Sequence, residues 1–298
     1  MGKSLDLKEF KILTMLESQV DCALTQREIA AKAGLSVGTV NHAMVDLHDR
    51  GYVREGALTA VGLEALEPYR VRRAVLIAAG FGSRLVPITL NTPKPLARVN
   101  GRRIIDSLLD AVQAAGIEEV YVVRGYLAEQ FDQLLYQYPN IKFIENPIYN
   151  EANNISSTLA AKDVLANAYV FESDLLLYSP KLITKYQYAS NYLGVPVERT
   201  DDWCFQTRRG VITGLTVGGT DCHHMFGISY WTEEDGKKLA QDIPATFAMP
   251  GGMERYWDEV ALRYFADRYE VRVRECSFDD VIEIDTFREL QELDEAYR

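Results

Sequence analysis

The feature that most constrains the fold is an apolar run at residues 74–79, Ala-Val-Leu-Ile-Ala-Ala, which stops at Gly80. A run of this length with a glycine-rich exit predicts a strand that is buried on both faces. Beyond it, strand and helix patterns alternate. We expect helices at 104–115, 127–136 and 158–165, and strands at 120–123, around Phe143 and at 169–172. This alternation predicts an α/β domain with a mainly parallel sheet, whose ligands gather at the carboxyl ends of the strands.

Residues 1–70 have a different pattern, so we expect a separate domain there and a second domain at 72–298. Thr25 can cap a helix that Gly34 ends, and Ser36 can cap a third helix with one apolar face. Two helices with a glycine in the turn between them form the helix-turn-helix pattern. A hairpin-like segment at 52–59 and a helix at 61–69 complete a small winged helix-turn-helix domain, which resembles the MarR-like domains.

Composition and charge place the chain in the ordinary globular range. It has 298 residues, of which 47% are hydrophobic and 25% charged, and this length allows two cores. The formal net charge is −11, so polyanions are repelled on average and any phosphate contact must be local. An acidic protein that handles nucleotides usually needs a cation.

The cysteines and the apolar segments exclude several classes of protein. The four cysteines are widely scattered and form no CxxC pair, which argues against a zinc site or a disulfide framework; they are Cys22, Cys204, Cys222 and Cys276. The chain starts without an apolar signal core, and no apolar run approaches the ~20 residues that span a bilayer. We therefore expect a cytoplasmic protein without a membrane segment.

A phosphate-binding loop is predicted directly after the first strand. Gly80 and Gly82 let the backbone turn tightly and direct N–H groups at an anion, while Arg84 and Lys94 add positive charge. A strand followed by GxGxR and then by Pro-Lys is far more specific than GxGxR alone. The dinucleotide pattern GxGxxG and the Walker pattern GK[ST] are both missing from this loop.

The segment at 76–96, LIAAGFGSRLVPITLNTPKPL, resembles the signature of the sugar-phosphate and choline-phosphate nucleotidyltransferase superfamily. Within it, the chain most resembles the bacterial lic-type CTP:phosphocholine cytidylyltransferases, from about Arg73 to the C-terminus. Similar segments follow in the right order at 123–131, 153–157, 172–174, 256–258 and 282–285. The resemblance implies a Rossmann-like nucleotidyltransferase domain that transfers CMP from CTP to phosphocholine, giving CDP-choline and pyrophosphate with Mg²⁺.

Two aspartates suggest where the metal lies. Asp174 follows the apolar strand 168–171, and Asp285 ends the predicted strand 281–284. Carboxylates at strand ends make an oxygen site suited to Mg²⁺, and the resemblance assigns both residues to the metal. The acceptor phosphate is itself an anionic nucleophile, so catalysis needs alignment and charge stabilisation by Arg84 and Lys94 rather than a general base.

No catalytic role is therefore expected for a histidine; the chain has His42, His48, His223 and His224. We expect the adjacent pair, His223 and His224, to be a surface or loop feature.

The substrate contacts follow from the loop and from the resemblance. We expect the nucleotide to contact Ala78, Ala79, Gly80, Gly82 and Ser83. The resemblance places the pyrimidine near Gly125 and Tyr126, and Asn154 and Ser157 near the nucleotide or the acceptor. Aromatic faces and carboxylates suit a quaternary ammonium group, and we expect them around the acceptor at Asp202, Trp203, Tyr256, Trp257, Asp258 and Glu283. The family pattern is broken at Ser156 and Leu175. Aminoethylphosphonate and sugar 1-phosphates therefore stay open as alternative acceptors.

The role of residues 1–70 is open between DNA binding with autoregulation and a structural or dimerising function. Through Arg72 the chain has nine basic and ten acidic residues, a net of −1, so the electrostatic contribution to DNA affinity is small. A nucleotide-sensing transcription regulator is the alternative of another class. A pure sensor would not need the charge set formed by Arg84, Lys94, Asp174 and Asp285, which favours an enzyme.

Overall fold

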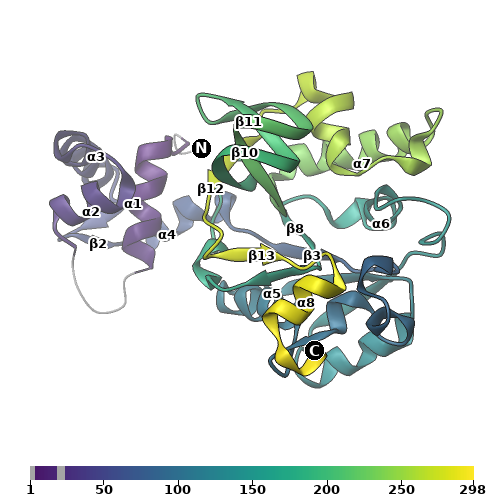
Figure 1. Cartoon of the computed structure of the whole chain (residues 1–298). Helices are drawn as coiled ribbons and strands as arrows, with labels where there is room; N and C mark the ends of the chain where they lie inside the picture. Colours follow the sequence, from purple (N-terminus) through teal and green to yellow (C-terminus); the bar gives the residue numbers. More distant parts are fainter. Residues whose placement is uncertain (1–3, 19–23) are drawn as a thin grey trace. The chain divides into compact units, whose positions relative to one another are not determined.

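The computed structural model describes residues 4–18 and 24–298 (Figure 1). The chain forms two compact units. Unit 1 comprises Met1–Arg70 together with Tyr186–Tyr188, and unit 2 comprises Val71–Lys185 and Ala189–Arg298. None of the described helices combines the length and the apolar character that crossing a membrane requires. Cys22 lies outside the described residues.

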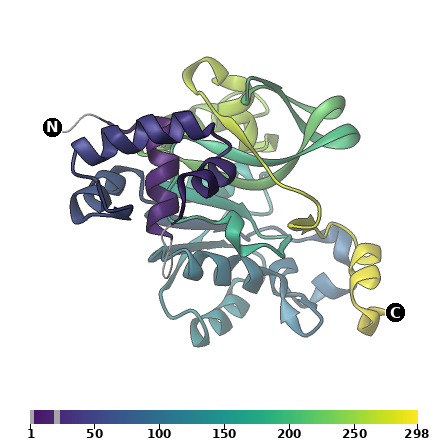
Figure 2. The ribbon, with the colours of Figure 1, turned by 90° about the vertical axis from the view of Figure 1, so that its left-hand side faces the viewer.

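Unit 1 is the winged helix-turn-helix domain expected from the sequence, and its helices form the purple to blue group in Figure 2. Its elements are α1 (Leu7–Glu17), α2 (Gln26–Ala33), α3 (Val37–Asp49), β1 (Val53–Arg54), β2 (Ala57–Leu58) and α4 (Ala60–Leu66). Thr25 caps α2 in a capping box, Gly34 ends it with φ +62°, and Ser36 caps α3 through the backbone N–H of Thr39. The side-chain caps therefore fix the turn between the two helices.

The segment Tyr186–Tyr188 returns to unit 1 from far along the chain. The rings of Tyr69 and Tyr188 are stacked with centroids 5.5 Å apart, and both hydroxyl groups donate to the carbonyl oxygen of Leu5 at 3.2 Å. Phe10 packs against both tyrosines. The sequence pattern gave no indication of this return, because three residues carry no periodic signal.

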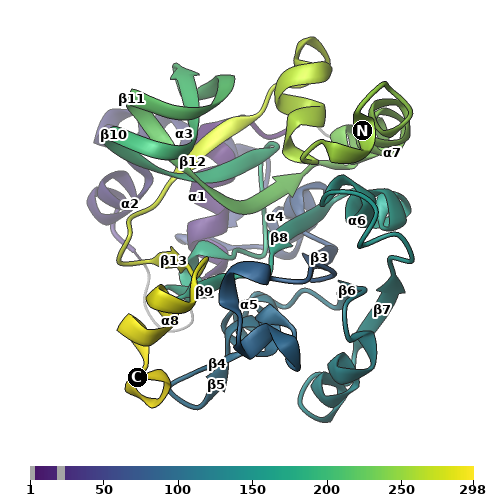
Figure 3. The ribbon, with the colours of Figure 1, turned by 45° about the vertical axis from the view of Figure 1, so that its right-hand side comes forward.

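Unit 2 contains a seven-stranded sheet with the order β10-β12-β11-β8-β3-β6-β7 (Figure 3). The strands are β3 (Arg73–Ile77), β6 (Glu119–Arg124), β7 (Ile141–Glu145), β8 (Ala168–Glu172), β10 (Asn191–Arg208), β11 (Val211–Trp231) and β12 (Arg272–Glu275). Strands β8, β3, β6 and β7 are parallel, whereas β11 is antiparallel to β8. The expected α/β class with a mainly parallel sheet is confirmed.

Helices cover both faces of this sheet. Helix α5 (Ile104–Ala114) contributes to the hydrophobic core that contains Ala74 and Leu76. Helix α7 (Glu233–Phe247) contributes to the other core, which contains Val75. Successive residues of β3 thus enter opposite cores, which explains why its sequence is apolar throughout. The remaining helices are α6 (Ile155–Ala160) and α8 (Phe287–Leu293).

Several element boundaries differ from the expectations. The first strand ends at Ile77, because Ala78 and Ala79 already belong to the turn beside the cavity. The segment expected as a helix at 127–136 is a 3₁₀ helix, Ala128–Tyr136, which begins after Leu127 with φ +48°. The helix expected at 158–165 is divided into α6 and a 3₁₀ turn, Lys162–Val164.

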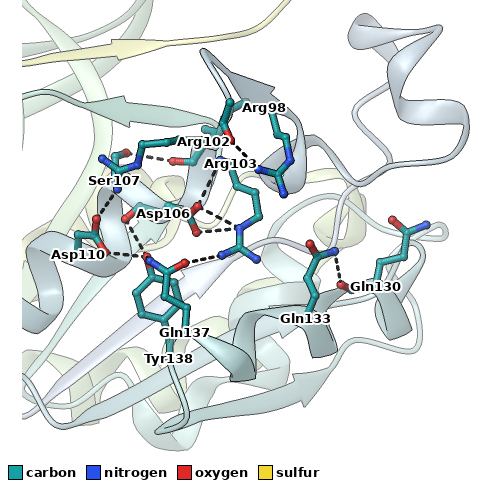
Figure 4. Close-up of polar contacts among 12 residues, drawn as sticks. Arg98, Arg102, Arg103, Asp106, Ser107, Asp110, Gln130, Gln133, Gln137 and Tyr138 are labelled. Carbon is teal, nitrogen blue, oxygen red and sulfur yellow. Dashed lines mark hydrogen bonds and ion pairs between the residues drawn. The ribbon is translucent and has the colours of Figure 1, made fainter.

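A polar network joins α5 to the 3₁₀ helix (Figure 4). Arg103 donates to both carboxylate oxygens of Asp106 at 2.9 and 3.0 Å, and to Gln137 at 2.9 Å. The Tyr138 hydroxyl group donates to Asp110 at 2.7 Å. These contacts satisfy buried polar groups between the two elements and fix α5 in position.

Candidate active site

A cavity of about 460 Å³ lies in unit 2 at the carboxyl ends of β3 and β8. Its wall combines a glycine turn with two basic residues, a group of carboxylates, and exposed aromatic rings from the hairpin β10–β11 and the 252–258 segment. The lining residues are Ile77, Ala78, Gly80, Gly82, Ser83, Arg84, Lys94, Pro95, Asn153, Asn154, Glu172, Ser173, Asp174, Asp202, Trp203, Leu215, Met225, Gly227, Tyr256, Asp258, Glu283 and Asp285.

The glycine turn is constrained at Gly82, whereas a Cβ atom at Gly80 would meet nothing within 4 Å. Gly82 has φ +67°, and a Cβ atom there would lie 2.9 Å from the Cβ atom of Lys94 and 3.2 Å from Cγ2 of Thr89. The Thr89 hydroxyl group donates to the carbonyl oxygen of Gly82 at 2.9 Å. A residue with a side chain would therefore be strained at Gly82 and would displace Lys94. Ala79 is buried and does not line the cavity; its carbonyl oxygen accepts from the Tyr126 N–H group at 3.0 Å.

Lys94 lies between the two predicted metal ligands. Its Nζ atom is 2.9 Å from Oδ2 of Asp174 and 3.2 Å from Oδ1 of Asp285, and Arg84 is 2.7 Å from the same Asp285 oxygen. Burial tends to lower the pKa of Lys94, but the two carboxylates outweigh it and hold this pKa above its ordinary value. Lys94 is therefore a fixed positive charge at the centre of the acidic group.

Two short strands bring the distant acids together. Strand β9 (Leu175–Leu177) pairs with β13 (Val281–Glu283), and the N–H group of Ile284 donates to the carbonyl oxygen of Asp174 at 3.0 Å. Ser107 of α5 accepts a hydrogen bond from the N–H group of Leu177 at 3.0 Å, which anchors β9. Asp174 and Asp285 consequently lie side by side although 111 positions separate them in the chain.

Three carboxylates could hold a divalent cation. Asp174, Glu283 and Asp285 each offer an oxygen atom, and these atoms lie within 4.8 Å of one another. Oδ1 of Asp174 is buried and has no hydrogen-bond partner among the described residues. Burial, together with the neighbouring charges of Asp174 and Asp285, raises the pKa of Glu283 to about 9. An oxygen-only ligand set with such repulsion suits a hard cation such as Mg²⁺.

The carboxylate and aromatic residues predicted for the acceptor separate into two groups. Trp203 and Tyr256 line the cavity and form an edge-to-face pair with ring centroids 5.4 Å apart, beside Asp202 and Asp258. Trp257 does not line it. It is 2% exposed and packs in the core against Tyr192 and Trp231, with ring centroids at 6.1 and 5.9 Å. Adjacent residues point apart here, so only Tyr256 presents a ring to the cavity.

Asp258 is a buried acid next to a tyrosine. Its Oδ1 atom accepts a hydrogen bond from the Tyr192 hydroxyl group at 2.6 Å. Burial raises the pKa of Asp258, hydrogen bonds to the carboxylate offset part of this rise, and the resulting pKa is about 7. The side chain is therefore sensitive to any positive charge that enters the cavity.

The other predicted nucleotide contacts are scattered. Asn154 lines the cavity, whereas Gly125, Tyr126 and Ser157 do not. The Tyr126 hydroxyl group donates to the carbonyl oxygen of Thr89 at 2.7 Å and so supports the loop before Lys94. Ser157 is buried and accepts a hydrogen bond from the side chain of Asn146 at 3.1 Å.

Of the surface or loop location expected for the histidine pair, the loop is wrong, because both half-buried residues lie on a strand. His223 and His224 lie in β11, and the ring of His224 packs against Phe226 and Phe278 at centroid distances of 5.2 and 5.3 Å. Neither residue lines the cavity.

Sequence reasoning missed several lining residues, among them Glu172, Leu215, Met225 and Gly227. A signal existed for Glu172, because it is the last residue of the predicted strand 169–172 and ligands gather at the carboxyl ends of such strands. No comparable signal marked the others. They lie on β11, within a long irregular hairpin whose alternation is interrupted by register shifts.

Comparisons with known proteins agree with this geometry. A family model described as a MobA-like NTP transferase domain matches residues 74–200, and one described as winged helix-turn-helix DNA-binding matches residues 5–54. The chain is 36% identical over 228 residues to 2-aminoethylphosphonate cytidylyltransferase of Lancefieldella rimae, covering 75% of this chain and 92% of that protein. It is 29% identical over 230 residues to choline-phosphate cytidylyltransferase of Streptococcus pneumoniae, covering 76% and 98%.

A solved structure extends the likeness to three dimensions. The structure of CTP:phosphocholine cytidylyltransferase from Streptococcus pneumoniae matches with a TM-score of 0.70 and 28% identity, covering 77% of this chain and all of that one. The fold and the cavity thus define a nucleotidyltransferase domain joined to a winged helix. The chain belongs to the family of nucleotidyltransferases that includes these cytidylyltransferases.

Proposed function

We propose that unit 2 transfers CMP from CTP to 2-aminoethylphosphonate with Mg²⁺, releasing pyrophosphate. The observation that carries this proposal is one cavity with two chemically different walls. Lys94 and Arg84 face the carboxylates of Asp174 and Asp285 on one wall, and Asp202 and Asp258 lie beside aromatic rings on another. The 36% identity to a 2-aminoethylphosphonate cytidylyltransferase supports the choice of acceptor.

The reaction needs few covalent steps from the protein. An anionic oxygen of the acceptor attacks the α-phosphorus of CTP in line, a new P–O bond forms, and the bond to the β-phosphate oxygen breaks as pyrophosphate leaves. Asp174, Glu283 and Asp285 would hold Mg²⁺, which when bound neutralises triphosphate charge. Arg84 and Lys94 add fixed positive charge, and the Gly80–Gly82 turn lets phosphate approach the backbone.

The acceptor end of the cavity favours a primary ammonium group over a quaternary one. A primary ammonium group has three N–H donors that can bond directly to carboxylates, whereas a trimethylammonium group depends on aromatic faces. With Trp257 packed in the core, Trp203 and Tyr256 are the aromatic rings among the lining residues. This arrangement moves phosphocholine, the acceptor that the sequence favoured, to second place.

Phosphocholine remains the second candidate on one specific observation. The edge-to-face pair of Trp203 and Tyr256, at 5.4 Å between ring centroids, offers an aromatic corner next to Asp202. The 29% identical choline-phosphate cytidylyltransferase supports the same reading. Each well-placed ring contributes about 1–2 kcal/mol of cation–π attraction to a desolvated quaternary ammonium group.

Pyrophosphate release with an acceptor panel tests the proposal. Purified protein is incubated with Mg²⁺, CTP and 2-aminoethylphosphonate, phosphocholine or glucose 1-phosphate, and the nucleotide is then changed to UTP. We expect the highest kcat/KM for CTP with 2-aminoethylphosphonate, by about tenfold or more over phosphocholine, because hydrogen bonds to charged groups contribute ~1.5–3 kcal/mol. A higher kcat/KM with phosphocholine or a sugar phosphate would overturn the acceptor, and silence with every pair would overturn the activity.

A further inference from the structure

Glu172 occupies an unusual position on the wall of the cavity. It is the last residue of β8, and it lies across Gly227 of the neighbouring antiparallel strand β11. A Cβ atom on Gly227 would be 2.4 Å from Oε2 of Glu172 and 2.6 Å from its Cγ atom. Side chains on facing strands normally keep their Cβ atoms about 4.5–5.5 Å apart. The absent side chain at Gly227 therefore provides the space in which this carboxylate lies.

One oxygen of Glu172 is held by Asn154. The Oδ1 atom of Asn154 accepts a hydrogen bond from the N–H group of Trp257 at 2.9 Å, so its amide nitrogen must face the other way. That nitrogen donates to Oε1 of Glu172 at 3.0 Å. The second oxygen, Oε2, has no hydrogen-bond donor among the residues that the structure describes. Asn154 thus fixes the carboxylate while one oxygen keeps its bonding capacity.

The surroundings of this oxygen are acidic. Glu172 shares the lining of the cavity with Asp174, Asp258 and Glu283. Lys94, the lysine among the lining residues, is already bonded to Asp174 and Asp285. A cation with N–H donors would supply what this corner of the cavity lacks.

We propose that Glu172 receives the ammonium group of the acceptor and that Gly227 determines this specificity by making room for the carboxylate. Asn154 is then a positioning residue rather than a nucleotide contact. The inference rests on the proposed transfer to an ammonium-bearing acceptor. Glu172 and Gly227 are then both required for recognition of the ammonium group.

A comparison of two acceptors isolates the contact. Wild-type kcat/KM is measured with 2-aminoethylphosphonate and with ethylphosphonate, which has the same reacting group and no amine. Glu172→Gln keeps an oxygen for Asn154 but places an N–H₂ group toward the ammonium. We expect KM for 2-aminoethylphosphonate to rise about 30-fold, with kcat/KM for ethylphosphonate within about threefold of wild type.

The variant Gly227→Ala tests whether the space at Gly227 is needed for Glu172. Its Cβ atom would displace Glu172, so we expect the same loss of preference for the amine, and the double variant Glu172→Gln/Gly227→Ala should be no worse than either single variant. Gly214→Ala is the matched control on β11, since its Cβ atom would meet its nearest neighbour at an ordinary 3.6 Å. Glu118→Gln is the matched control for Glu172→Gln. It removes one exposed charge outside the cavity and should leave kcat/KM for both acceptors unchanged.

The outcomes are distinguishable from failure of the proposed function. If wild type prefers phosphocholine, the uncharged carbon isostere of phosphocholine replaces ethylphosphonate. The ratio of kcat/KM for the charged acceptor to kcat/KM for the uncharged one is then compared among the variants. An equal fall for the charged and uncharged acceptors in Glu172→Gln, or additive losses in the double variant, would overturn the assignment. Circular dichroism of each variant identifies any that does not fold, and Glu172→Asp, which keeps the charge, should retain more preference for the amine than Glu172→Gln.

Discussion

Lys94 shows how single residues set the charge of this site. Its ammonium group is buried between Asp174 and Asp285, and Arg84 bonds to the same Asp285 oxygen. The sequence indicated these four residues individually, because each follows a strand or a glycine turn. It could not indicate that Lys94 bonds to both acids, since that contact depends on the pairing of β9 with β13.

Removing either aspartate charge should impair catalysis far more than folding. We expect Asp174→Asn and Asp285→Asn each to lower kcat by roughly two to four orders of magnitude, because each weakens the oxygen site for Mg²⁺. Pyrophosphate release over a range of Mg²⁺ concentrations measures the effect. Asp279→Asn, an exposed aspartate near β13, is the matched control and should be unchanged. Near-normal rates at saturating Mg²⁺ would remove the substituted residue from the metal site.

Asp258 predicts a pH dependence of stability. Burial raises its pKa to about 7, so the folded state binds this proton more tightly than the unfolded state, whose pKa is close to the ordinary 3.8. The contribution to stability is therefore largest at low pH and is lost as the pH rises from about 4 to about 7. Tyr192 and Glu259 face the carboxyl group of Asp258. The hydrogen bond from Tyr192 lowers the pKa of Asp258, whereas the charge of Glu259 raises it.

We expect Asp258→Asn to flatten this dependence in the substrate-free protein. The asparagine can still accept the hydrogen bond from Tyr192 but carries no titrating proton. Relative to Asp258→Asn, the wild-type free energy of unfolding should fall by roughly 2–4 kcal/mol across that window, measured by denaturant unfolding at several pH values. Parallel pH profiles for the two proteins would instead show that folding does not shift the pKa of Asp258.

At the scale of elements, the sequence predicted best where one periodicity holds over a whole segment. Strand β3 and helix α5 have uninterrupted apolar patterns, and the caps at Thr25 and Ser36 mark α2 and α3. The hairpin β10–β11 was not predicted. Its strands are long, and register shifts break the alternation at several pairs, so no window has a clean two-residue period. The hairpin carries Leu215, Met225 and Gly227, which explains why these lining residues were missed.

Helix α3 allows a prediction about DNA. Asp46 and Asp49 are exposed on it, and Arg50 at its end is 2.8 Å from Glu9. We therefore expect non-specific duplex binding weaker than a Kd of ~10⁻⁵ M at physiological salt. Asp46→Asn/Asp49→Asn should tighten it several-fold and steepen its salt dependence, as measured by fluorescence anisotropy. Glu64→Gln on α4 is the control and should leave the affinity unchanged. Nanomolar binding of random duplex by wild type would contradict the expectation that the acidic residues of α3 weaken DNA binding.

At the scale of the whole molecule, the residues of the cavity belong to unit 2, while Gly62 belongs to unit 1. A Cβ atom on Gly62 would lie 2.2 Å from the carbonyl oxygen of Tyr52, a backbone atom that cannot move without shifting β1. We expect Gly62→Ala to destabilise unit 1 by about 1–3 kcal/mol and lower its unfolding temperature by roughly 5–15 °C. Turnover at moderate temperature should stay within about threefold of wild type, because no lining residue is altered.

The tryptophans make the two units separable in one experiment. The chain has three, and Trp203, Trp231 and Trp257 all belong to unit 2. In Gly62→Ala, the helical circular dichroism should begin to fall at a lower temperature while the tryptophan fluorescence transition stays in place. Gly38→Ala on α3, whose Cβ atom would meet only Ser36 Oγ at 3.9 Å, is the control and should leave both transitions unshifted or slightly higher. A fluorescence transition that moves together with the circular dichroism would instead show that the units unfold as one cooperative body, and the stability of the site would then depend on the winged helix.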